Sequence, residues 1–343
     1  MPAAETATQS LDGRGPRRAP LTLSKKIFGA LFTAALLALL ALAIRRSPAE
    51  IFSSLRNAQP AFLVAGFFLN VLAFGVRAFR FNLLLLPADR IPFAAAWSLS
   101  GATTFLLQVM PFRSGEIASW ASIRAALGAS WARSAAVLAL VKLLDTATLL
   151  LAGLAGAAWL LFARGTHVLG SAVAALVFLG TGLLLALPLA GGRLLASLVP
   201  RLPGGGRRQA IAREVAEGLS VARREPGSYA LAAASAGIFL ALHIPALWLT
   251  ARGLGLPIHP ATLAVALLTS IATAAILPSP AGTFGPYESG FAAAAALEGI
   301  PLAGGAVLGA CLHLLTTLAA GLTGLPFLLS RLRENRASRR NVD

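Results

Sequence analysis

Long apolar blocks recur along the chain, and they constrain its fold more than any other feature. The blocks at 27–44 and 171–190 are long enough to cross about 30 Å of hydrocarbon as helices. They are continuous runs, unlike the alternation of half-buried strands or the heptads of a coiled coil. Composition agrees, because 57% of the residues are hydrophobic and only 12% are charged. The sequence therefore predicts an all-α polytopic membrane protein.

The apolar runs predict about six full spans. These are 27–44, 61–86, 134–163, 167–190, 228–250 and 302–329. A cleaved signal peptide is an alternative for the first run, but that run is long for one and two arginines follow it. Two further regions, 93–128 and 261–300, each hold two apolar legs separated by a Pro/Gly loop. We expect each to be a re-entrant helix pair, which gives eight or more membrane helices counted by legs.

The basic residues predict the orientation. Lys and Arg gather at 1–26, 191–227 and 330–343, with a smaller group at 77–92. The positive-inside rule places the large groups in the cytoplasm. That placement works only if both broken regions return to the side from which they enter. We therefore expect a basic cytoplasmic tail at 1–26, one membrane domain at 27–329, and a second cytoplasmic tail at 330–343.

The two broken regions have the same order of features. The first contains, in order, Met110, Pro111, Gly115, Glu116 and the span 134–163. The second contains, in order, Leu277, Pro278, Gly282, Gly285, Glu288 and the span 302–329. Because the regions open from opposite sides, they predict an inverted repeat (about 93–163 and about 261–329), as in many secondary transporters. The alternative is two interfacial turns with no site between them.

Charged residues within the apolar sequence are candidate site residues. Glu116 and Glu288 each follow a loop at a helix start, where a carboxylate caps free N–H groups. With Arg113, they alternatively form a polar centre. Lys142 and Asp145 lie at i and i+3 inside an apolar run, where a charge costs about 2.5–3.5 kcal/mol. They form either a structural ion pair or part of a lining for an anionic headgroup or a proton path.

Two stretches carry a family resemblance. MPFRSGE, with VKLLD after it, and LPSPAGTFGPYESG resemble motifs of the lysylphosphatidylglycerol synthase transmembrane region, or flippase-like family. The resemblance implies substrate-binding residues: Arg113, Glu116, Arg124, Lys142, Asp145, Glu288 and His313. It implies loop-shaping residues: Pro111, Gly115, Pro278, Pro280, Gly282 and Gly285. Three positions depart from the family pattern: Ser119 and His313, where arginines are common, and Ala281, where glycine is.

The resemblance implies a stand-alone, multi-pass protein of the bacterial inner membrane that moves a lipid or lipid-linked substrate between leaflets. The substrate is expected to have an anionic headgroup or to be a polyprenyl- or hopanoid-type lipid. Lipid aminoacylation is not expected, because the chain ends soon after its last span. Two alternatives stay open: a non-catalytic partner of a lipid-modifying enzyme, and an intramembrane lipid-modifying enzyme.

The sequence offers little for other functions. The single cysteine, Cys311, excludes an internal disulfide and a cysteine-based zinc site, and the four histidines have no metal-ligand spacing. No serine has a histidine at a recognisable motif spacing. The arginines follow the membrane topology and lack interleaved aromatic residues, which argues against nucleic-acid binding. No enzyme activity, cofactor, metal or nucleic acid is expected. Within 191–227 we expect a short basic helix on the anionic cytoplasmic leaflet.

Overall fold

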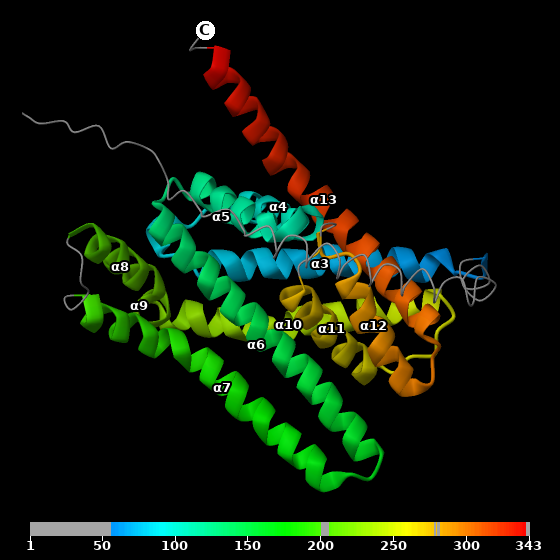
Figure 1. Ribbon diagram of the computed structural model, residues 1–343. Helices are drawn as coiled ribbons and strands as arrows, with labels where there is room; N and C mark the ends of the chain where they lie inside the picture. Colours follow the sequence, from blue (N-terminus) through cyan, green and yellow to red (C-terminus); the bar gives the residue numbers. More distant parts are fainter. Residues whose placement is uncertain (1–55, 200–205, 278, 280–281, 341–343) are drawn as a thin grey trace, which may run out of the picture.

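The computed structural model describes residues 56–199, 206–277, 279 and 282–340. Side chains are not described for Arg113, Leu184, Leu195, Arg207, Arg208 and 332–340. The described residues form helices and no strand (Figure 1). The α-helices are α3 (Pro60–Leu83), α4 (Phe93–Val109), α5 (Ser114–Leu127), α6 (Trp131–Ala163), α7 (His167–Leu198), α8 (Gly206–Leu219), α9 (Val221–Arg224), α10 (Pro226–Gly253), α11 (Pro260–Ile276), α12 (Pro286–Ala295) and α13 (Leu302–Arg340). Short 3-10 turns are η1 (Pro87–Asp89), η2 (Pro111–Arg113) and η4 (Ala296–Glu298).

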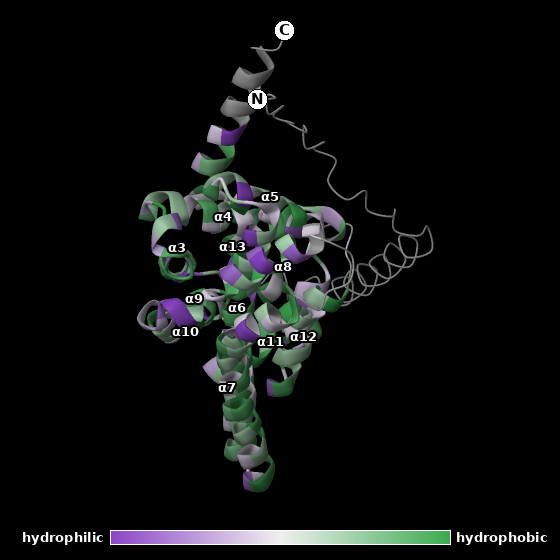
Figure 2. Cartoon of the chain, turned by 90° about the vertical axis from the view of Figure 1, so that its left-hand side faces the viewer, coloured by the Kyte–Doolittle hydropathy of each residue, from purple (hydrophilic) through white to green (hydrophobic). Residues whose placement is uncertain are grey.

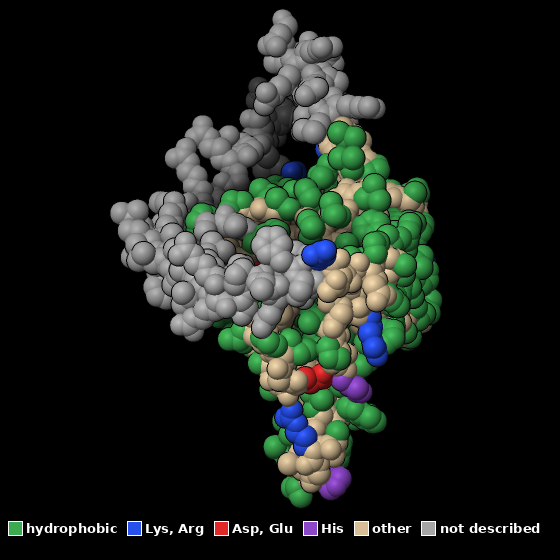
Figure 3. All heavy atoms as spheres, turned by 90° about the vertical axis from the view of Figure 1, so that its right-hand side faces the viewer, with side chains coloured by type: hydrophobic (Ala, Val, Ile, Leu, Met, Phe, Trp, Pro, Cys, Tyr) green, Lys and Arg blue, Asp and Glu red, His purple; other side chains and the backbone are tan. Residues whose placement is uncertain are grey.

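Five of the described helices are long and apolar enough to cross a membrane. They are α3, α6, α7, α10 and the first 30 residues of α13. Each coincides with an expected span, whereas the expected span 27–44 lies outside the described residues. Figure 3 shows one face of the molecule, on which hydrophobic side chains predominate and charged groups are few. The all-α polytopic membrane fold is therefore confirmed.

Both expected pairs of apolar legs form helix pairs broken at proline. Met110 and Leu277 are extended, with ψ of 134° and 115°, which is typical of a residue before proline. Each therefore ends its helix, α4 or α11. Both helices have 17 residues and are about 26 Å long, less than the hydrocarbon thickness of about 30 Å.

The helices pack in a regular pattern of pairs. α3 and α10 lie side by side through the centre (Figure 1). α4 packs on α5 and α13, while α11 packs on α12 and α6. Glycines allow two of these crossings: a Cβ at Gly101 would lie 2.6 Å from the Gly324 nitrogen, and one at Gly156 would lie 2.5 Å from the Ala261 oxygen. Small residues let membrane helices approach closely in this way.

Each broken pair has its own hydrophobic core. The first core joins α3, α4, α5, α6 and α10, and includes Leu84, Leu99 and Leu140. The second joins α10, α11, α12 and α13, and includes Leu263 and Phe291. α10 contributes to both, and a third, smaller cluster joins Phe74 of α3 to Ala319 and Ala320 of α13.

The hairpin of α6 and α7 extends away from this body (Figure 1). Along α7 the apolar side chains point outward, and Val168, Phe178 and Leu179 are among the most exposed. Figure 2 shows this protruding length as largely hydrophobic, with hydrophilic residues near α8 and α9. In a spanning helix such side chains face lipid. The helix α8 forms within 191–227, as expected.

Candidate functional site

The two Pro/Gly loops meet. The amide of Phe112, in the α4–α5 loop, donates to the oxygen of Ser279 at 2.9 Å. The amide of Thr283, in the α11–α12 loop, donates to the oxygen of Gln108 at 3.1 Å. Gly282 has a φ of +70°, and a Cβ there would lie 1.9 Å from the Gln108 oxygen. Only glycine fits this contact, so the predicted loop-shaping role of Gly282 has a physical cause.

A buried carboxylate lies next to this contact. Glu288 is 2% exposed, and its Oε2 accepts the amide of Gly285 at 2.6 Å. Its Oε1 lies 2.7 Å from Nδ1 of His313, whose Nε2 lies 3.1 Å from the Thr283 hydroxyl. The ring of Phe284 stacks on His313 with centroids 4.0 Å apart. Glu288 therefore caps α12 and also binds α13, and the structure brings together two predicted site residues.

Asp145 binds two arginines of α3. Its Oδ2 accepts from Arg77 at 2.7 Å, and its Oδ1 accepts from Arg80 at 2.9 Å. Arg80 also donates to the hydroxyl of Thr148 at 3.2 Å, and Arg77 donates to that of Thr104. Arg80 is 2% exposed. Two guanidinium groups thus face one carboxylate near the middle of α6, which leaves a surplus of positive charge.

A polar face of α4 connects these two clusters. Ser100, Thr104 and Gln108 are spaced four residues apart and so lie on one side of the helix. Thr104 is bound by Arg77. One turn further, about 6 Å along the axis, the Gln108 side chain accepts from the Thr317 hydroxyl at 2.9 Å. The arginine cluster and the meeting point of the loops therefore form one polar centre.

A small cavity adjoins the arginine cluster between α3, α4, α5 and α6. Its volume is about 20 Å³, and Arg77, Ser100, Ser119 and Lys142 are among the residues that line it. This volume is sufficient for about one water molecule. Ser119, which stands where the family commonly has arginine, is fully buried and donates to the Thr103 oxygen at 3.1 Å. Lys142 and Arg77 place two cationic groups at the cavity.

Other predicted site residues lie at the edges of this centre. Glu116 is in the first turn of α5 and is exposed. Arg124 is in the last turn of α5, and its guanidinium lies 4.7 Å from the ring centroid of Trp131. The side chain of Arg113 is outside the described residues. Glu116 and Arg124 therefore both lie on the exposed side of α5.

The structure describes four of the six predicted loop-shaping residues, Gly282 among them. Pro111 begins η2, directly after α4 ends. A Cβ at Gly115 would lie 2.3 Å from the Leu106 oxygen, so glycine lets α5 approach α4. Gly285 has a φ of +89°, which a side chain would strain. Pro278 and Pro280 are outside the described residues.

Sequence reasoning missed Arg77 and Arg80. It counted them in the basic group at 77–92 that served to orient the chain, and it gave them no part in the site. The structure places both within α3, bound to Asp145. Their i, i+3 spacing inside an apolar run was the available signal, since the same spacing singled out Lys142 and Asp145. Their partner Asp145 lies on another helix, so the ion pairs themselves could not be seen from spacing along the chain.

One protein family matches most of the chain. No curated protein and no solved structure matches the sequence. The sequence profile of the lysylphosphatidylglycerol synthase TM region matches residues 26–324. That range includes the polar centre and both helix pairs. The chain is therefore a multi-pass membrane protein that belongs to the lysylphosphatidylglycerol synthase transmembrane-region family, as its motifs predicted.

Proposed function

We propose that the protein is a non-enzymatic translocator, which moves a lipid or lipid-linked molecule with an anionic headgroup between the leaflets of the bacterial inner membrane. The observation that carries the proposal is the cationic cluster of Arg77, Arg80 and Lys142 beside two broken helices. Asp145 is the carboxylate that Arg77 and Arg80 share. A centre of this kind supports transient binding of a phosphate or carboxylate inside the membrane.

The cluster suits an anionic headgroup chemically. Arginine binds phosphate and carboxylate through two parallel hydrogen bonds, and these are strong where water is scarce. Without substrate, Asp145 holds Arg77 and Arg80 in position. In our proposal a headgroup binds at Arg77 and Lys142 and shares the guanidinium with Asp145. Arg80, which is more deeply buried, stays bound to Asp145 and Thr148 throughout.

The helix packing supports an inverted repeat. One half consists of α3, α4, α5 and α6, and the other of α10, α11, α12 and α13. In the proposed repeat each helix of the first half corresponds, in this order, to one of the second. Under this correspondence the contact of α4 with α13 is equivalent to the contact of α11 with α6, and the structure has both. The contact of α3 with α10 joins the two equivalent helices to each other. We propose that the halves are inverted, because the charge pattern makes them open from opposite sides.

The loop contact supports movement between two states. Among the described residues, two backbone hydrogen bonds join the α11–α12 loop to the α4–α5 loop and to the last turn of α4. Each contributes about 0.5–1.5 kcal/mol net, which is small enough to break and reform during a transport cycle. We propose that the loops separate on one side and then on the other as the headgroup passes.

Reconstitution tests the proposed function. The full chain is placed in liposomes with a headgroup-labelled phosphatidylglycerol probe, and the accessible fraction is measured with an impermeant quencher. Matched vesicles receive a phosphatidylcholine probe. We expect protein-dependent movement of the anionic probe at least tenfold faster than that of the zwitterionic probe. Equal rates for both probes, or no movement above protein-free vesicles, would contradict the proposal.

A further inference from the structure

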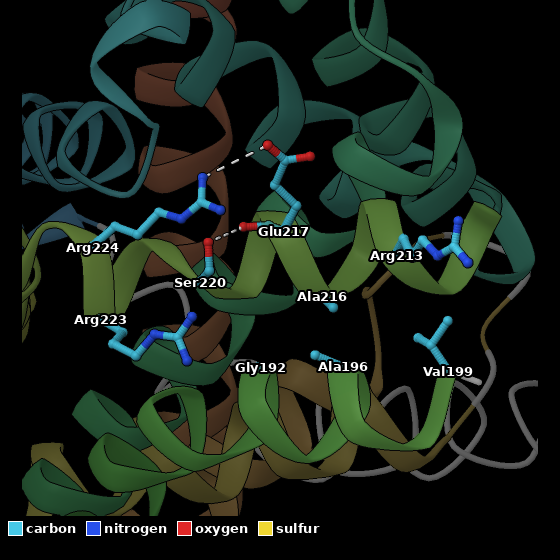
Figure 4. A pocket seen from close by; sticks show the side chains of 9 residues that line it. All are labelled: Gly192, Ala196, Val199, Arg213, Ala216, Glu217, Ser220, Arg223 and Arg224. Atoms are coloured by element: carbon cyan, nitrogen blue, oxygen red, sulfur yellow. Dashed lines mark hydrogen bonds and ion pairs between the residues drawn. The ribbon is translucent and has the colours of Figure 1, made fainter. Parts of the chain in front are cut away.

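A second polar site lies outside the polar centre, between the end of α7 and the helices α8 and α9. It is a pocket of about 410 Å³, within the size range of ordinary ligand sites. Gly192 and Ala196 of α7, with Val199 directly after it, form one wall. Figure 4 shows the facing wall, formed by α8 and α9, and the open space between the two walls.

The charged groups around this pocket are mostly cationic. Arg213, Arg223 and Arg224 line it, together with Glu217. Arg224 and Glu217 form a loose ion pair at 3.7 Å, and both side chains are about half exposed. Figure 4 shows Arg213 and Arg223 toward opposite ends of the pocket. Three guanidinium groups against one carboxylate make the pocket a site for an anion.

Contacts with α6 hold the wall of α8 in place. A Cβ at Gly218 would lie 2.4 Å from the Cβ of Ala136, so α8 packs closely on α6. The hydroxyl of Ser130, at the start of α6, donates to Glu214. At the end of α8 the hydroxyl of Ser220 donates to the backbone oxygen of Glu217 at 2.6 Å. The arginines are therefore presented from a fixed backbone.

The position of the pocket identifies the class of anion. α7 exposes apolar side chains along its length, including Leu187, Leu194 and Leu198 near its end. A helix of this kind faces acyl chains, so its end lies at the level of the headgroups. The pocket is at that end. The charge pattern of 191–227 places it on the cytoplasmic leaflet, where anionic lipids attract basic pockets.

We propose that this pocket binds the phosphate of an anionic phospholipid in the leaflet that surrounds the end of α7. The small apolar side chains of Ala196, Val199 and Ala216 leave room for the glycerol region. Because Arg213 and Arg223 lie toward opposite ends of the pocket, Arg223 contacts the phosphate and Arg213 contacts the polar end of the headgroup. Binding here does not depend on translocation. It anchors α8 and α9 to the bilayer and so fixes the end of the α6–α7 hairpin.

Native mass spectrometry of the full chain in detergent tests the proposal. Phosphatidylglycerol is titrated, and diacylglycerol, which lacks the phosphate, serves as the lipid control. We expect the first phosphatidylglycerol to bind at least tenfold more tightly than diacylglycerol. Arg213→Gln and Arg223→Gln should each weaken that binding about tenfold, the loss of one charge-assisted contact. Arg193→Gln removes an exposed arginine of α7 that does not line the pocket, and should change binding less than twofold.

Three results would overturn the proposal. One is an equal loss of phosphatidylglycerol binding in Arg193→Gln and Arg223→Gln, which would indicate a general attraction of the lipid to the positive charge of the protein. Another is full displacement of the lipid by an equal concentration of inorganic phosphate, which would indicate a soluble anion as the ligand. The third is equal binding of phosphatidylglycerol and diacylglycerol by the wild-type chain, a result that needs no variant to fold. Thermal unfolding of each variant shows that lost binding does not reflect lost structure.

Discussion

The α4–α5 and α11–α12 regions share a helix of 17 residues, a Pro/Gly loop and a glutamate in the first turn of the next helix. Their glutamates lie in opposite environments. Glu288 is buried and bound by Gly285 and His313, whereas Glu116 is exposed. The first region instead lies beside charges from α3 and α6. The same motif therefore holds a buried glutamate bound to a histidine in one half and an exposed glutamate in the other.

Removal of the two glutamates should have very different effects on stability. Glu288→Ala leaves the Gly285 amide and the His313 ring without their partner, at about 1–3 kcal/mol for each buried group. We expect the free energy of unfolding to fall by about 3 kcal/mol. Glu116→Ala, at an exposed site, should change it by less than about 0.5 kcal/mol. Denaturant unfolding in detergent measures both.

Similar losses in the two variants would break the comparison, because they would mean that Glu116 is also bound in the folded protein. Glu288→Gln sharpens the result. The amide oxygen still accepts from Gly285, so about half of the loss should return if capping and His313 binding contribute equally.

Alanine at Gly282 should separate the two loops. The substitution strains a positive φ and places a Cβ 1.9 Å from the Gln108 oxygen, so the loop has to move. We expect a loss of about 2 kcal/mol. Gly299 has a φ of +73° with no atom within 4 Å of its Cβ position, so Gly299→Ala carries the strain alone and should cost about 1 kcal/mol. A loss no greater in Gly282→Ala would show that the loop contact is absent in the membrane.

The apolar runs and the proline positions predicted most of the fold. The expected span 134–163 is α6, Trp131–Ala163, and the ends of α4 and α11 follow from Pro111 and Pro278. These features are local, since they depend on consecutive residues and on backbone geometry.

The site was only partly predictable. The link between Glu288 and His313 joins residues 25 apart, and sequence spacing alone does not show that α13 passes behind α12. Family resemblance selected both residues. Asp145 binds arginines 65 and 68 residues earlier in the chain. Such a partner becomes apparent only when α3 and α6 are packed together.

Site-directed labelling tests the opposite orientation of the two regions. In a Cys311→Ser background, Leu297→Cys lies after α12, at a position where leucine is 47% exposed. Gly205→Cys lies in the basic loop. An impermeant thiol reagent applied to intact spheroplasts should label position 297 and leave position 205 unlabelled until the membrane is permeabilised. Labelling of both, or of position 205 alone, would contradict the inverted arrangement.

The central claim is that the cationic groups beside α4 recognise the headgroup, and transport by Arg77→Gln tests it most directly. Arg252→Gln is the control, because that guanidinium lies over the ring of Trp248 at the end of α10, outside the polar centre. In liposomes with the labelled phosphatidylglycerol probe, we expect Arg77→Gln to move the probe at least tenfold more slowly than wild type, at equal amounts of folded protein. Arg252→Gln should retain at least half of the wild-type rate. A wild-type rate in Arg77→Gln would contradict the claim.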